Sequence, residues 1–172
     1  MFPNNPVKRK NLIMWGLYSL LLFAVILIQS VYLGQFTLAG VHFDLLPLLV
    51  SAVAVVTGAE CGGIFGLCAG FAWALSGGAD GGMTIVCLTV SGVAAGYLCD
   101  SVLTRRLPTA VLMALMSLII TIGGVLLVRM YMGESGLWGL RLGLRQTVLT
   151  LPLSPLLYWA AKYIRKAGPD NG

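Results

Sequence analysis

The chain consists of long apolar runs separated by short segments of glycine, proline and charged residues. A helical run of about 20 apolar residues matches the hydrocarbon thickness of a bilayer. The pattern therefore predicts an all-α integral membrane protein, with six transmembrane helices in a compact bundle. The expected spans cover about 12–33, 44–58, 60–77, 83–103, 108–131 and 140–164. They form one membrane domain over 12–164, between tails at 1–11 and 165–172.

Two of the expected spans are unusual. The segment 44–58 is short, because fourteen helical residues cover only about 21 Å. It either continues to Glu60 or is partly re-entrant, and the sequence leaves both possibilities open. The last span contains Pro152 and Pro155. A proline inside a helix removes a backbone hydrogen bond, so we expect a kink there.

The basic residues indicate the orientation of the spans. If all six cross, the clusters at 8–10, 105–106 and 162–166 fall on one side, and they hold eight of the eleven Lys and Arg residues. The positive-inside rule makes that side cytoplasmic. Both termini are then cytoplasmic.

Composition narrows the class of protein. Hydrophobic residues make up 58% of the 172 residues and charged residues only 10%, which is far below the roughly 25% of soluble domains. The net charge of +5 sits in clusters beside apolar runs, which is typical of contact with anionic lipid rather than nucleic acid. Four cysteines without a CxxC pair and a single histidine do not indicate a metal site. With no catalytic or phosphate-binding motif, we expect no enzyme, cofactor or metal.

Glycines recur every four residues in the middle of the chain, and residues four apart share one face of a helix. The series comprises Gly58, Gly62, Gly66 and Gly70, and the spacing recurs at Gly92 and Gly96. In a bilayer, such a face lets a second helix approach closely. We expect a tightly packed helix at the centre of the bundle, against another helix of this chain or a partner protein.

Charged residues gather around the loop before the last span, on the predicted external side. They are Arg129, Glu134, Arg141 and Arg145. Arginine at membrane depth usually faces a cavity, a partner or a counter-charge. The group is therefore a candidate contact for an acidic ligand or partner. Alternatively, the arginines extend to the headgroups and Arg129 pairs with Glu134.

A second external group combines Asp44, Pro47, Asp80 and His42, all near span ends. Asp44 can cap the second span, with Pro47 in its first turn. Asp80 lies in a glycine-rich turn. These residues form either a polar rim or a set of caps and turns.

Three features lie at the predicted inner side. Asp100 is one turn beyond Gly96, on the same helix face, and we expect it to pair with Arg105. Glu60 is expected in a cytoplasmic turn. Tyr158 and Trp159 are expected in the interfacial aromatic belt.

The order of these motifs resembles the rod-shape-determining MreD family. The resemblance covers most of the chain from the second span onward. It consists of Asp44-Leu45-Leu46-Pro47, the glycine series leading to Gly70-Phe71, Arg105-Arg106-Leu107-Pro108, and the closing helix PLLYWAAKYIRK. The chain departs from the family pattern after Gly70-Phe71. Leu75, Ser76 and Gly77 stand where an acidic residue is expected, and the nearest acid is Asp80.

The resemblance implies a non-enzymatic scaffold subunit of the bacterial cell-elongation machinery, which sets rod shape through peptidoglycan synthesis. It implies a multi-pass protein of the plasma membrane that binds an MreC-like bitopic protein, and through it an MreB-like filament and wall synthases. It also implies a fold similar to substrate-binding subunits of energy-coupling-factor vitamin transporters. The alternative function is such a transporter subunit, but the first span has a single alanine, Ala24, where those subunits often carry Ala-xxx-Ala.

Overall fold

The computed structural model describes residues 6–33, 44–77, 81–101, 107–131, 133 and 137–166. These residues are helical apart from short turns, and no strand occurs among them. The helices are α1 (Pro6–Leu27) with a π-helical continuation (Ile28–Leu33), α2 (Leu46–Thr57), α3 (Ala59–Leu75), α4 (Gly81–Ser101), α5 (Leu107–Tyr131), α6 (Leu137–Thr150) and α7 (Ser154–Lys166). A 3-10 turn (Leu151–Leu153) joins α6 to α7, so the two form one interrupted helix. The all-α prediction is confirmed for this part of the chain.

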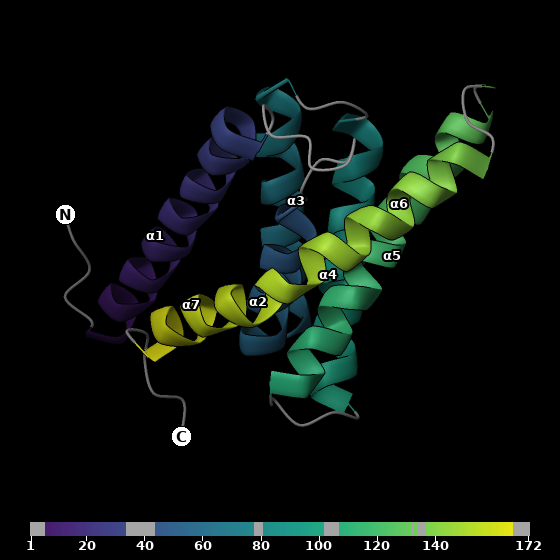
Figure 1. Ribbon diagram of the computed structural model, residues 1–172. Helices are drawn as coiled ribbons and strands as arrows, with labels where there is room; N and C mark the ends of the chain where they lie inside the picture. Colours follow the sequence, from purple (N-terminus) through teal and green to yellow (C-terminus); the bar gives the residue numbers. More distant parts are fainter. Residues whose placement is uncertain are drawn as a thin grey trace.

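Within the described residues, three helices are long and apolar enough to cross a membrane. They are Arg9–Val31, Gly82–Ser101 and Pro108–Val128, and the shorter apolar helices α2 and α3 lie between the first two. The three candidate spans indicate a multi-pass membrane protein. Consecutive helices run in alternating directions, and α1 begins at the same end of the molecule at which α7 ends (Figure 1).

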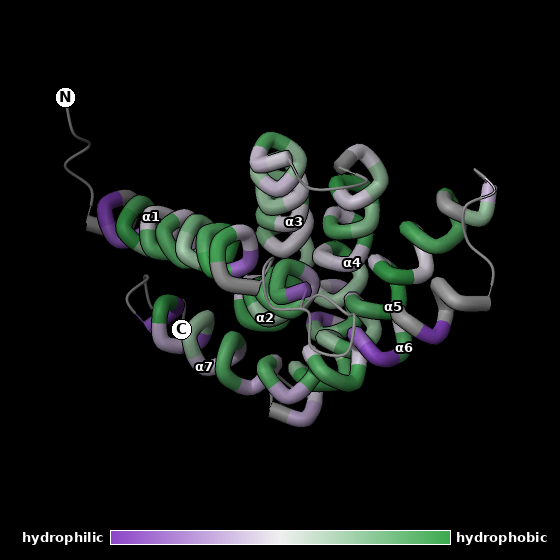
Figure 2. Tube along the Cα trace, turned by 45° about the horizontal axis from the view of Figure 1, so that its top comes forward, coloured by the Kyte–Doolittle hydropathy of each residue, from purple (hydrophilic) through white to green (hydrophobic). Residues whose placement is uncertain are grey.

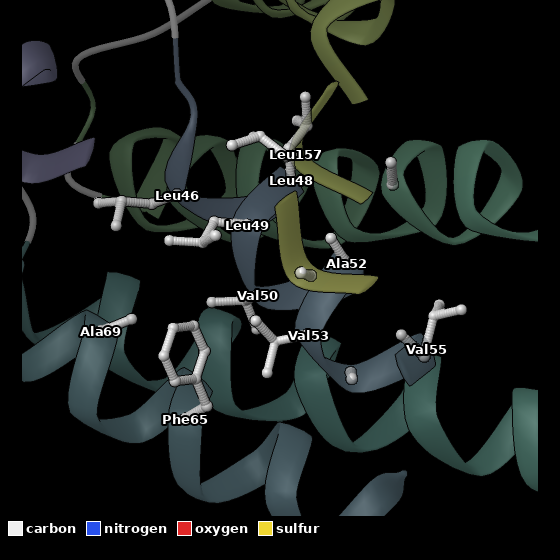
Figure 3. Packing of buried hydrophobic residues seen from close by; sticks show 14 of the residues in the cluster. Leu46, Leu48, Leu49, Val50, Ala52, Val53, Val55, Phe65, Ala69 and Leu157 are labelled. Carbon is white, nitrogen blue, oxygen red and sulfur yellow. The ribbon is translucent and has the colours of Figure 1, made fainter. Parts of the chain in front are cut away.

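The centre of the bundle is α2, not the glycine-rich helix that the sequence favoured. Every residue from Leu46 to Val56 is buried, and α2 contacts α3, α4, α5 and α7. Figure 3 shows its side chains directed to several sides, toward Phe65 and Ala69 of α3 and toward Leu157 of α7. In contrast, α3 buries only one face.

The opposite face of α3 explains this correction. It carries the exposed side chains of Ile64, Leu67 and Phe71, which are large and apolar. Such side chains suit contact with lipid. Helix α2 has no charged residue and is apolar apart from Ser51 and Thr57, so it can be enclosed on all sides without burying a charge.

Helix ends also differ from the predicted ones. Helix α1 begins at Pro6, so part of the expected tail at 1–11 is helical. The helix can begin there because proline is favoured in a first turn and the Lys and Arg residues that follow are good helix formers. The predicted helix 140–164 starts earlier, at Leu137, and is interrupted at Leu151–Leu153. The interruption lies at Pro152, which cannot donate a backbone hydrogen bond.

One long-range contact fixes the C-terminal helix against α1. The Tyr18 hydroxyl donates to the Ala161 carbonyl oxygen over 3.1 Å, and the Tyr18 ring meets Phe65 edge-on at 6.1 Å between centroids. Tyr158 is buried and Trp159 is 70% exposed. Of the two residues expected in the aromatic belt, Tyr158 therefore belongs to the core.

Candidate partner-binding site

Glycines bring α3 and α4 together backbone to backbone. A Cβ atom added at Gly62 would lie 2.5 Å from the Ala54 Cβ atom of α2, and one at Gly70 would lie 2.6 Å from the Ile85 Cα atom of α4. A Cβ atom at Gly66 would meet the Leu88 carbonyl oxygen, and one at Gly92 would meet that of Gly62. Real Cβ atoms do not approach backbone atoms so closely. At these glycines the two helices therefore leave no room for a side chain.

The same interface continues to the α2–α3 turn. A Cβ atom at Gly96 would lie 2.6 Å from the Gly58 carbonyl carbon. Gly58 is the one residue between α2 and α3, and its φ of +101° lies in the left-handed region that favours glycine. The six glycines singled out by the sequence thus line one contact, from Gly58 to Gly70 on one side and at Gly92 and Gly96 on the other.

Two charged side chains from distant helices hold this turn. The Ala59 backbone N–H, in the first turn of α3, donates to Asp100 Oδ2 over 3.3 Å. The Arg165 guanidinium of α7 donates to the Val56 carbonyl oxygen near the end of α2. An anion at a helix N-terminus and a cation at a helix C-terminus both oppose the backbone partial charges. We call Asp100, Arg165 and the turn at Gly58 the inner clamp.

The sequence indicated only part of the inner clamp. The sequence predicts that Asp100 lies on the glycine face of its helix, which agrees with its contact with α3. The predicted partner of Asp100, Arg105, lies outside the described residues. For Arg165 the sequence predicts only a role in topology. The Arg165 contact joins residues 109 positions apart, and no local pattern predicts it. Glu60 is exposed in the first turn of α3.

At the other end of α2, the helix begins at Leu46 with Leu45 at the N-cap, so Asp44, the predicted cap residue, lies one residue before the cap position. Its carboxyl still interacts with the Leu46 backbone N–H at the start of the helix. Asp44 Oδ1 also accepts from Gln29 Nε2 over 3.2 Å, and the Leu45 N–H donates to Gln29 Oε1 over 3.2 Å. Gln29 thus ties the π-helical end of α1 to the start of α2.

Pro47 is an internal residue rather than part of an external rim. It lies in the first turn of α2 and is fully buried. Its carbonyl oxygen accepts from the Ser117 hydroxyl of α5 over 3.0 Å. Asp80 and His42, the other members of the expected rim, lie outside the described residues.

The four residues of the expected external cluster are only partly described. Arg141 and Arg145 are exposed on α6, one turn apart. Arg129 lies in α5, but its side chain is outside the described part of the structure, as is the whole of Glu134. The structure therefore gives no contact that joins the four.

The described residues contain no group of three His, Cys, Asp or Glu residues that could hold a metal ion. The four cysteines form no disulfide bond; Cys87 and Cys99 are buried and Cys68 is exposed. Comparisons with protein-family models, with curated proteins and with solved structures gave no match to this chain.

Proposed function

We propose that this protein is a non-enzymatic scaffold subunit of the bacterial cell-elongation machinery, embedded in the plasma membrane. It binds an MreC-like single-span protein, and through it an MreB-like filament and the wall synthases. Support comes from the order of sequence motifs that resembles the MreD family, and from an all-helical fold with several apolar helices. Six spans with both termini in the cytoplasm belong to the same proposal.

The observation that carries the proposal is the α3–α4 unit. Its inner face is locked by backbone contacts at the glycines. Its outer residues are large and apolar on both helices, namely Ile64, Leu67 and Phe71 on α3 and Val86, Val90 and Val93 on α4. A rigid apolar surface loses little entropy when a membrane helix packs on it. This suits the binding of a single-span partner from the lipid side.

Mild-detergent purification from native membranes, followed by mass spectrometry, tests the function. We expect an MreC-like protein and wall-synthesis proteins to co-purify, without a bound metabolite. Recovery of an ATPase pair, a coupling membrane protein and a retained vitamin would identify a transporter subunit instead.

A matched pair of variants tests the surface. We expect Leu67→Trp on α3 to reduce recovery of the single-span partner at least fivefold, because the indole displaces a packed helix. Ile119→Trp on α5 is the control, since Ile119 is 53% exposed and Leu67 is 50% exposed. If the single-span partner is recovered equally well with Leu67→Trp and with Ile119→Trp, the partner binds another face of the protein.

A further inference from the structure

The exposed face of α7 has a graded composition. Leu156, Trp159 and Tyr163 are 71%, 70% and 78% exposed, and Lys162 and Lys166 are exposed with them. Leu156, Trp159, Tyr163 and Lys166 follow one another at three- and four-residue steps, so they share one side of the helix. Along that side the character changes from aliphatic through aromatic to basic.

This order matches the depth profile of one membrane leaflet. Lys166 follows Leu156 by ten helical residues, which is about 15 Å along the helix axis and about half the hydrocarbon thickness. Tryptophan and tyrosine concentrate at the boundary between hydrocarbon and headgroups, and lysine at the level of the phosphates. The face therefore fits lipid along its whole length, with its charged part at the headgroups.

The charge of the face selects the kind of lipid. Helix α7 carries three basic residues and no acidic one. One of the three, Arg165, is engaged by the Val56 carbonyl oxygen. The Lys162 ammonium lies 5.9 Å from the centre of the Tyr158 ring, within the range of a cation–π contact. Lys162 and Lys166 are both exposed.

A second basic segment lies at the same end of the molecule. Arg9 and Lys10 are exposed at the start of α1, and α1 is joined to α7 through Tyr18 and Ala161. Figure 2 shows hydrophilic positions both at the start of α1 and at the end of α7. Positive charge on two neighbouring helices strengthens attraction to an anionic leaflet.

We infer that the outer face of α7, formed by Leu156, Trp159, Lys162, Tyr163 and Lys166, is a binding site for an anionic phospholipid. The aliphatic and aromatic side chains hold the acyl chains and the glycerol region. The two lysines hold the phosphate. This site is separate from the α3–α4 surface proposed for a protein partner, so either can fail without the other.

Native mass spectrometry of the full chain in neutral detergent, titrated with phosphatidylglycerol, tests the site. Each lysine near an anionic headgroup contributes about a fivefold change in affinity. We therefore expect Lys162→Gln with Lys166→Gln to weaken binding of the first phosphatidylglycerol about 25-fold. The control, Lys162→Arg with Lys166→Arg, keeps the charge and should bind as the original protein does.

Two results would overturn the inference. The first is equal binding of phosphatidylcholine and phosphatidylglycerol by the original protein, because the site would then select no charge. The second is unchanged phosphatidylglycerol binding by the glutamine variant. If that variant instead loses a co-purifying protein, the face is a protein-binding surface.

Discussion

Gly58 and Asp100 show how single residues set the reversal between α2 and α3. Gly58 supplies the positive φ that lets one helix end and the next begin with one residue between them. Asp100 then satisfies the Ala59 N–H, which has no partner within its own helix. The turn therefore belongs to α2 and α3, whereas the side chain that stabilises it belongs to α4. The glycine contact between α3 and α4 brings the end of α4 beside the turn.

Substitutions at Asp100 should separate its hydrogen bond from its charge. Asp100→Asn keeps an acceptor for the Ala59 N–H but removes the negative charge. Asp100→Ala removes both the hydrogen bond and the charge. The lost hydrogen bond lowers the free energy of unfolding by about 1 kcal/mol, and the lost charge at the helix dipole by up to about 1 kcal/mol. Thermal unfolding in detergent should rank the original protein above Asp100→Asn, and Asp100→Ala lowest. Ser101→Ala, at an exposed neighbour, is the control and should be neutral. Equal Tm values for Asp100→Ala and Ser101→Ala would contradict a capping role.

Among the elements, the α3–α4 pair carries the tightest contact, and two glycines provide a matched test of it. A Cβ atom at Gly66 would run into backbone atoms of Leu88 and Thr89, whereas a Cβ atom at Gly123 of α5 would meet nothing within 4 Å. We expect Gly66→Leu to lower the free energy of unfolding by about 1–3 kcal/mol or more, because backbone cannot yield as a side chain does. Gly123→Leu should stay within about 0.5 kcal/mol of the original.

Thermal unfolding and the monodisperse fraction in size-exclusion chromatography measure both variants. If Gly66→Leu and Gly123→Leu lose the same stability, the harm comes from leucine at any of these glycines and not from its position between α3 and α4. Unchanged behaviour of Gly66→Leu would contradict the close contact itself.

The elements also show which features a sequence can reveal. Apolar runs predict helices, and small residues four apart indicate close contact, so the sequence predicts the glycine faces at Gly62 and Gly92. It does not predict the position of α2 at the centre, because an apolar helix in lipid and an apolar helix in a protein core have the same composition. The contacts of Gln29 with Asp44 and of Arg165 with Val56 depend on how helices are placed in space. Hydrophobic periodicity contains no such information.

At the scale of the whole molecule, the short length of α2 is compatible with a bundle that crosses the membrane six times. Its twelve residues cover about 18 Å, less than the hydrocarbon thickness. A lipid-facing helix of that length would be mismatched. Since α2 is enclosed by its neighbours, its ends need not reach the headgroups. The directions of the helices in Figure 1 then alternate from α1 to the α6–α7 unit.

This alternation predicts the topology of the chain, which reporter fusions can measure. A fusion after Ser76, at the end of α3, should be external, and fusions after Leu107 and after Lys166 should be cytoplasmic. Alkaline phosphatase is active only outside and green fluorescent protein fluoresces inside, so each position gives opposite signals with the two reporters. If α2 and α3 together made a single crossing, all three results would reverse for the same cytoplasmic N-terminus. The basic clusters at 105–106 and 162–166 would then be external, against the charge rule that oriented the bundle.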